Sequence, residues 1–136
     1  MNGFQIKAKK IVVDTNVFFM SLYNPEGKAG KIINSAIKGK IHLFSPDTVK
    51  EELYRVLKKE IGFSDYEINF IIDNLPVTWV DRGIYKNFID KTKVKYKADK
   101  PIEALSLVLD CGVLSADKHF KNRINVNELL KELGNN

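Results

Sequence analysis

The sequence predicts an α/β fold in which a parallel sheet carries helices on both faces. Short apolar runs alternate with amphipathic helical patterns along the chain, and acidic residues stand at the ends of some of these runs. The first run is continuously apolar, as in a strand that is buried on both faces. Strands separated by helices form parallel βαβ units, because a parallel connection needs a crossover. No repeat or linker interrupts the pattern, so residues 1–136 are expected to form one domain.

Four runs have the length and composition of strands. The first, KIVVD (10–14), is rich in β-branched residues and ends in an acid. The other three expected strands are residues 41–44, 77–80 and 113–114.

Helical spacing of apolar residues, with capping signals, predicts the helices between these strands. Ser45-Pro46-Asp47 and Ser64 are expected to open two of them, and Asp99-Lys100-Pro101 a third. The expected helices cover residues 28–36, 47–57, 64–75, 102–109 and 126–133.

Composition limits the classes of function. With 44% hydrophobic and 29% charged residues, the chain is typical of a globular protein, and no apolar run approaches the roughly 18 residues of a membrane span. No membrane association and a cytoplasmic location are therefore expected. One cysteine and two histidines provide no disulfide and no zinc pattern, so a bound metal would be a hard cation held by oxygen ligands. The net charge of +5 suits a polyanion such as RNA, although surface lysines also serve solubility.

Two acids stand at strand ends. Asp14 ends the first expected strand, and Asp117 closely follows the fourth. In open parallel sheets the functional crevice lies at the carboxyl ends of the strands, so both carboxylates would converge there. The alternative is that each acid only forms a surface turn.

Two further acids are candidates from helices. Glu52 flanks the apolar face of its helix, whereas Glu51 points to solvent, so Glu52 is the candidate. Its alternative role is an ion pair with Arg55, three residues later. Asp99 precedes Pro101 at a helix start, where an aspartate is also a preferred cap.

Four such carboxylates suit phosphodiester hydrolysis, in which they hold one or two Mg²⁺ or Mn²⁺ ions. A phosphatase of the haloacid-dehalogenase type needs a second Asp two positions after the first, and Asn16 occupies that place. A dinucleotide site needs glycines after the first strand, and none is present there.

Four segments together resemble the PIN-domain nucleases: IVVDTNVFF (11–19), SPDTVKEELYRVL (45–57), ADKPIEALSL (98–107) and VLSADKHF (113–120). That family has an Asp ending strand one, a Glu before an aliphatic residue inside a helix, an Asp five positions before a small residue, and a segment like S/T-x-D-x-D-F. The residues of this chain that match these positions are Asp14, Glu52, Asp99 and Asp117.

The resemblance implies a three-layer α/β/α fold with a parallel sheet of four or five strands, dependence on Mg²⁺ or Mn²⁺, and RNA cleavage. Compact members resemble VapC-type toxins, which are ribonucleases inhibited by a small antitoxin and are commonly dimeric. An endoribonuclease toxin, an antitoxin partner and a homodimer are therefore expected. The alternatives are a processing or quality-control nuclease and a non-catalytic RNA-binding module.

The resemblance also suggests supporting residues. Asn16 and Ser115 match positions that orient carboxylates or metal-bound water, although they could simply start a helix and end a strand. His119 stands where many members have another acid, which would favour Mn²⁺ over Mg²⁺. It could instead touch phosphate, orient Asp117 or be a loop histidine. Glu103, one helical turn after Asp99, is a further candidate.

Lysines alternate with other residues immediately before Asp99. Period-two alternation predicts an extended segment or an edge strand with a cationic face, although a helix would also be compatible. The face could guide an RNA backbone, or it could protect an exposed sheet edge from aggregation. The residues concerned are Lys91, Lys93, Lys95 and Lys97.

Overall fold

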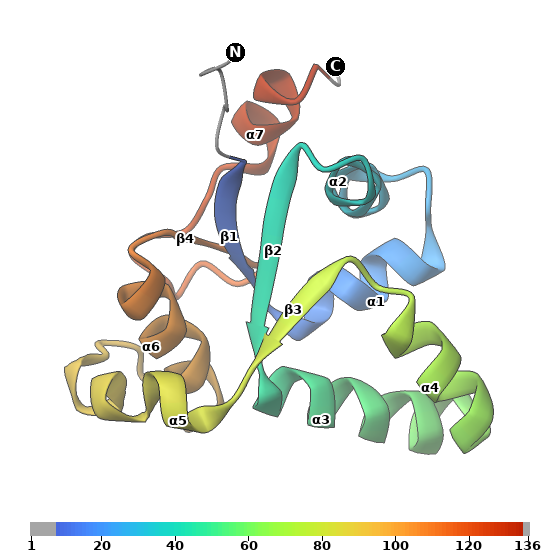
Figure 1. The fold of residues 1–136 in the computed structure, drawn as a ribbon, viewed down its shortest axis with the longest axis horizontal. Coiled ribbons are helices and arrows are strands. Elements are labelled where there is room, and N and C mark those ends of the chain that lie inside the picture. Colours follow the sequence, from blue (N-terminus) through green and yellow to red (C-terminus); the bar gives the residue numbers. More distant parts are fainter. Residues whose placement is uncertain (1–7, 135–136) are drawn as a thin grey trace, which may run out of the picture.

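The computed structural model describes residues 8–134, so the two ends of the predicted 1–136 domain lie outside the described residues. A four-stranded parallel sheet with the order β3-β2-β1-β4 forms its centre (Figure 1). The strands are β1 (Lys9–Val13), β2 (Ile41–Pro46), β3 (Val77–Val80) and β4 (Gly112–Leu114). All four predicted strands are confirmed, with β2 two residues longer than expected.

The strand β1 lies inside the sheet and is buried on both faces. Ile11 pairs with Leu43 of β2 on one side and with Gly112 of β4 on the other. Its neighbours Val12 and Val13 are also completely buried. A continuous β-branched run suits this position, because both faces of the strand contact helices.

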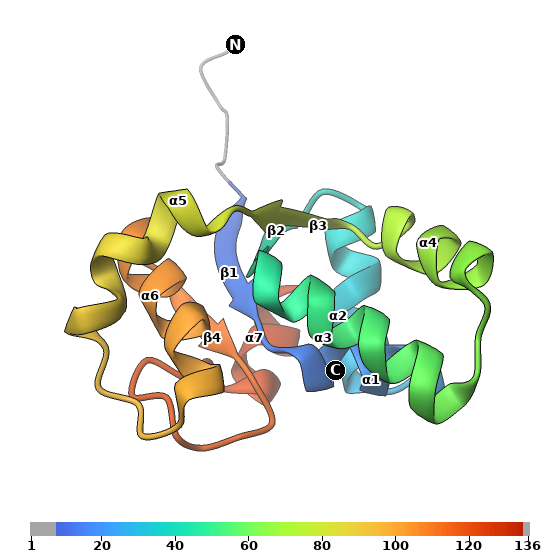
Figure 2. The ribbon, with the colours of Figure 1, turned by 90° about the horizontal axis from the view of Figure 1, so that it is seen from below.

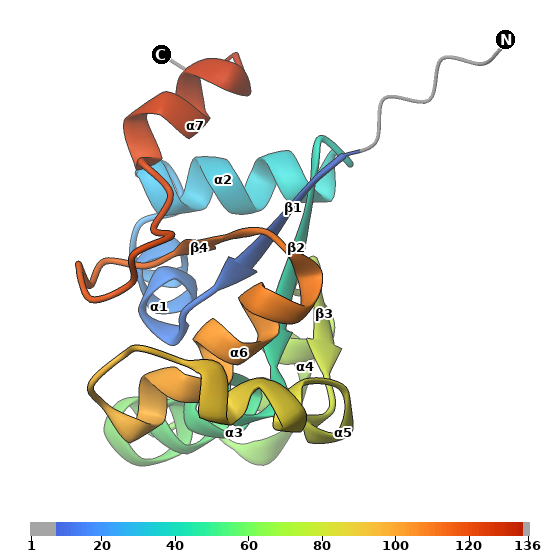
Figure 3. The ribbon, with the colours of Figure 1, turned by 90° about the vertical axis from the view of Figure 1, so that its left-hand side faces the viewer.

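Helices make the outer two of three α/β/α layers. Figure 3 shows α2 and α7 on one side of the strands and α6 on the other, while α1 and α3 begin at the carboxyl ends of β1 and β2. The helices are α1 (Thr15–Tyr23), α2 (Lys28–Ile37), α3 (Asp47–Val56), α4 (Asp65–Asp73), α5 (Arg82–Tyr85), α6 (Lys100–Leu109) and α7 (Val126–Glu132). None of the helices within residues 8–134 has the length and apolar character needed to cross a membrane.

Local capping explains several of these boundaries. Ser64 and Glu67 form a reciprocal capping box at the start of α4, in which each side chain accepts a hydrogen bond from the other residue's backbone N–H. A π-helical turn (Leu57–Ile61) extends α3 and ends at Gly62, whose φ of 85° is a conformation that glycine adopts readily.

The segment before Asp99 differs from the prediction. Lys91 ends a 3₁₀-helix (Lys86–Lys91), and a second one (Lys97–Asp99) leads into α6, so no edge strand forms here. The backbone between them is anchored by Glu103, whose carboxylate accepts hydrogen bonds from the N–H groups of Lys93 and Val94. A side chain thus takes the hydrogen bonds that a neighbouring strand would have made.

Candidate functional site

Asp14 directly follows β1 and caps α1. Its backbone N–H donates to the carbonyl of Leu114 at 3.0 Å, which ties the end of β1 to the end of β4. One carboxylate oxygen, Oδ1, accepts the Thr15 N–H at 2.7 Å, and the other, Oδ2, accepts the Ser115 hydroxyl at 2.7 Å. With only 6% of its surface exposed, Asp14 is a buried carboxylate in a fixed orientation.

Ser115 connects Asp14 to Asp117. Its hydroxyl oxygen donates to Asp14 and accepts the backbone N–H of Asp117 at 3.0 Å. The Nε of Arg123 donates to the Ser115 carbonyl at 2.9 Å and so supports the same turn. The turn after β4 is thereby held against the end of β1.

Asp99 reaches the same place from the start of α6. It occupies the cap position, but its side chain makes no capping hydrogen bond, so the carboxylate is available for another role. Its Oδ2 lies 3.6 Å from Nδ1 of His119. Its backbone N–H donates to the carbonyl of Tyr96 at 3.0 Å.

These three acids form a carboxylate cluster (Asp14, Asp99 and Asp117) at the carboxyl edge of the sheet. Each contributes one oxygen, and the three oxygens lie within 4.8 Å of one another. That spacing is compatible with a shared divalent cation, because oxygen ligands surround Mg²⁺ at about 2.1 Å. The donor set is composed of carboxylate oxygens, which suits a hard cation.

The electrostatics of the cluster favour bound positive charge. Burial raises the pKa of Asp14; hydrogen bonds from Ser115 and Thr15 oppose this effect, and the charges of Asp99 and Asp117 add to it. Burial also raises the pKa of Asp99, against the effect of His119 and with further contributions from Asp117 and Glu52. A divalent cation would relieve both the repulsion and the desolvation of these carboxylates.

Glu52 lies outside the cluster but near it. Its charge is the smallest of the contributions to the pKa of Asp99, so it acts on the cluster only through electrostatics. The side chain is 44% exposed, and its Oε2 lies 3.9 Å from an Arg55 guanidinium nitrogen. In this conformation Glu52 contacts Arg55 and is not among the three acids whose oxygens converge.

The other predicted site residues take different positions. Asn16 lies exposed in the first turn of α1 and makes no hydrogen bond to a carboxylate of residues 8–134. Glu103 is buried and binds the backbone of residues 93 and 94, so its carboxylate anchors the loop before Asp99. Lys93, Lys95 and Lys97 project from this loop and are exposed.

Two neighbours of the site were not predicted from the sequence. The ring of Tyr96 packs on His119 with a centroid distance of 5.0 Å, and Arg123 holds the Ser115 carbonyl. Neither residue belongs to a recognisable motif, because both contacts arise from the folding of loops.

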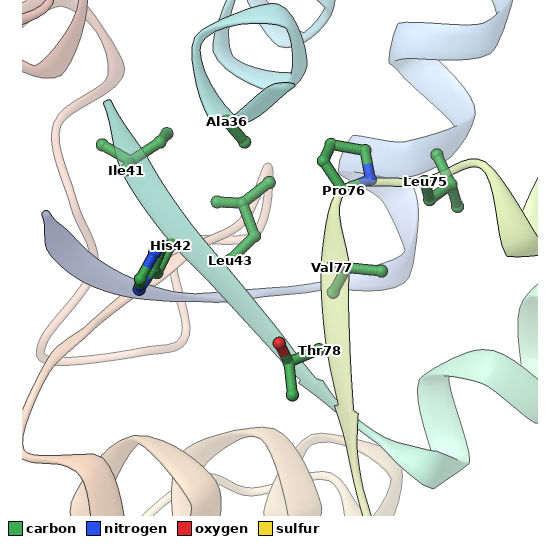
Figure 4. A pocket seen from close by; sticks show the side chains of 8 residues that line it. All are labelled: Ala36, Ile41, His42, Leu43, Leu75, Pro76, Val77 and Thr78. Atoms are coloured by element: carbon green, nitrogen blue, oxygen red, sulfur yellow. The ribbon is translucent and has the colours of Figure 1, made fainter. Parts of the chain in front are cut away.

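A separate pocket lies between α2, β2 and β3 (Figure 4). Ile41 and Leu43 project from β2 on the side of Ala36, and Pro76 and Val77 close the other side. None of the four predicted acids lines this pocket, so it is distinct from the carboxylate cluster.

Comparison with known proteins agrees with this geometry. The model of the PIN domain family matches residues 12–129, a range that includes all four predicted acids. No curated protein matches the chain. PIN domains are generally nucleases, and the observed three-layer parallel architecture is that of the family. The chain therefore belongs to the PIN domain family.

Proposed function

We propose that this chain is a metal-dependent endoribonuclease that hydrolyses RNA phosphodiester bonds at the carboxylate cluster, with Glu52 as a fourth acid. One observation carries the proposal: Asp14, Asp99 and Asp117, from three distant parts of the chain, bring oxygens within 4.8 Å of one another. Acids brought together in this way repel one another, and such an arrangement is typical of a cation site.

The residues present fit Mg²⁺ or Mn²⁺. Such an ion, held by the three aspartates, would supply a water of lowered pKa and neutralise charge on the phosphate. The chain's own contribution is orientation: Thr15 and Ser115 fix both oxygens of Asp14. His119 Nδ1 lies 3.6 Å from Asp99, and if it joined the three carboxylates as a ligand it would favour Mn²⁺ over Mg²⁺.

Exposed lysines in the loop before Asp99 support a nucleic-acid substrate, and RNA is proposed because of the resemblance to PIN-domain ribonucleases. Lys93, Lys95 and Lys97 project from the loop that leads directly into Asp99. Their charges would attract the phosphate backbone and release its counterions.

Cleavage of RNA in Mg²⁺ or Mn²⁺, with and without chelator, tests the proposal. We expect metal-dependent cleavage that Asp14→Asn lowers by roughly 100-fold or more, because a ligand is lost. Asp90→Asn removes an exposed carboxylate from the 3₁₀-helix Lys86–Lys91 and serves as the control with unchanged activity. Undiminished cleavage by Asp14→Asn would exclude this site. RNA binding without cleavage in either metal would instead indicate a non-catalytic binding module.

We further propose that this nuclease is the toxin of a toxin–antitoxin pair and forms a homodimer. Exposed apolar side chains on α1 and α2 support a protein partner, because an interface would bury them away from water. They are Met20, Leu22, Tyr23 and Ile37. Induced expression should stop growth, and Asp14→Asn should abolish this effect; a short neighbouring reading frame should relieve it. Normal growth with active enzyme would favour an RNA-processing role, and a monomer by light scattering would exclude the homodimer.

A further inference from the structure

Tyr96 presents an aromatic ring beside the carboxylate cluster. Its side chain is 52% exposed, although its ring contacts the His119 ring at a centroid distance of 5.0 Å and an interplanar angle of 48°. His119 lies 3.6 Å from Asp99, and the Tyr96 carbonyl accepts the Asp99 N–H at 3.0 Å. Tyr96 is thus connected to the cluster by the contact of its ring with His119 and by the hydrogen bond between its carbonyl and the Asp99 N–H.

The backbone that carries Tyr96 is anchored although it has no regular secondary structure. The buried Glu103 carboxylate accepts the N–H groups of Lys93 and Val94, and the Val94 side chain is itself buried. Lys100 Nζ lies 3.5 Å from the Val94 carbonyl. Two residues of α6 therefore fix the loop, so the position of the exposed ring is defined before any ligand binds.

The charges around Tyr96 match a nucleic-acid strand. Lys95 and Lys97 flank it in sequence, and both are exposed. An aromatic face between cations is how proteins bind single-stranded nucleic acid: the ring stacks on a base while the cations bind the backbone. In a duplex the bases are stacked on one another and cannot reach such a ring.

We propose that Tyr96 stacks on a base of the RNA next to the phosphate at the carboxylate cluster and so positions the strand for cleavage. The inference rests on the proposed nuclease function and adds a residue that positions its substrate. Tyr96 is a substrate-positioning residue, since the hydrolytic chemistry belongs to the acids. Its phenolic hydroxyl is not required, because stacking uses the face of the ring.

The chain offers a matched control in Tyr66. This residue is 81% exposed and lies on α4, which Figures 1 and 2 show on the opposite side of the molecule from α6. Replacing it removes the same chemical group from the surface at a distance from the cluster. Tyr96→Phe is the conservative variant, because it keeps the ring.

The test measures binding by fluorescence anisotropy in the Asp14→Asn background, in which cleavage is expected to be roughly 100-fold slower or more. The probes are a labelled short single-stranded oligoribonucleotide of mixed sequence and an abasic strand of equal length. We expect Tyr96→Leu to weaken binding of the first probe by about 5- to 100-fold and to leave binding of the abasic strand unchanged. Tyr96→Phe and Tyr66→Leu should bind both probes as the parent does. Thermal unfolding verifies that Tyr96→Leu, which keeps an apolar group against His119, remains folded.

Three outcomes would overturn the inference. Unchanged binding of the oligoribonucleotide by Tyr96→Leu, with an unchanged KM for cleavage in the active protein, removes the stacking role and leaves the nuclease function intact. An equal loss of affinity for both probes would show that the substitution disturbs the loop that carries the lysines and does not remove a base contact. Failure of the active protein to bind or cleave any RNA would overturn the proposed function and this inference together.

Discussion

The ionised side chain of Asp14 lowers the stability of the folded protein when no metal is bound. Burial and the neighbouring charges of Asp99 and Asp117 raise its pKa above the ordinary value for an aspartate, despite hydrogen bonds from Ser115 and Thr15 that oppose the shift. At neutral pH ionisation of Asp14 therefore costs more free energy in the folded protein than in the unfolded chain. A bound cation would relieve this unfavourable free energy. An acid that serves metal binding can therefore lower the stability of the metal-free protein.

Asp14→Asn should consequently stabilise the metal-free protein, by on the order of 1 kcal/mol or about 4 °C in Tm at neutral pH. The amide has nearly the same shape, and its oxygen can still accept the Thr15 N–H. Because the folded-state pKa is raised, the stability contribution of Asp14 is fully present below the unfolded pKa of about 3.9 and is lost as pH rises through the folded pKa. The advantage of the variant should therefore be small in acid and grow towards neutral pH.

Denaturant unfolding in the presence of a chelator, repeated over this pH range, measures the difference. Taking wild type minus variant cancels the contributions of other groups, such as Asp65, whose pKa is lowered by hydrogen bonds from Tyr54 and Lys58. Asp90→Asn again controls for removal of one negative charge. A variant less stable than wild type at neutral pH would mean that the hydrogen bonds to the Asp14 carboxylate outweigh its burial.

Among the elements, the start of α2 depends on close backbone contact. A Cβ on Gly30 would lie 2.0 Å from the carbonyl oxygen of Pro25, in the turn that precedes the helix. Backbone cannot yield by that amount without moving the turn, so we expect Gly30→Ala to destabilise the protein by about 3 kcal/mol or more.

Gly83 in α5 is the matched control for this prediction, since nothing lies within 4 Å of a Cβ placed there. Gly83→Ala should stabilise the fold by about 0.5 kcal/mol, because it restricts the unfolded chain. Urea unfolding of both variants makes the comparison. Equal stability of Gly30→Ala and wild type would show that the turn around Pro25 can rearrange freely.

Elements encoded by local pattern were predictable, and those created by tertiary contacts were not. The β-branched run of β1 and the Ser64 cap of α4 are sequence-local signals, and both elements are confirmed. The helix α1, TNVFFMSLY, escaped prediction because apolar and aromatic residues occur around most of its circumference and give no clear stripe. It depends on the Asp14 cap and on burial of Val17 and Phe18.

The same distinction holds for the candidate site. Strand-end position predicted that Asp14 and Asp117 would converge, because β1 and β4 are adjacent and parallel. The surroundings of the two acids could not be predicted: the alternating lysines indicated an edge strand, whereas the carboxylate of Glu103 holds that backbone. A contact between a buried side chain and a loop leaves no periodic signal in the sequence.

For the molecule as a whole, the cluster couples metal binding to folding, so thermal stability can report on metal binding. Asp14 follows β1, Asp99 starts α6 and Asp117 follows β4, so a shared cation would connect the ends of two adjacent strands with the start of the helix on one face. A ligand that binds only the folded state stabilises it by mass action, about 2.7 kcal/mol at a concentration 100 times Kd. For a chain of this size, this corresponds to a rise of about 10 °C in Tm.

Titration of the chelator-treated protein with Mg²⁺ or Mn²⁺, followed by thermal unfolding, should show this rise and should rank the acids. Asp14→Asn and Asp117→Asn are expected to abolish it, because each removes one of three converging oxygens. Glu52→Gln should retain most of it, since Glu52 lies outside the cluster and contacts Arg55. Asp90→Asn should respond as wild type does. Complete loss of the Tm shift in Glu52→Gln would mean that Glu52 leaves Arg55 and binds the ion directly. A wild-type Tm that neither metal changes would exclude the site.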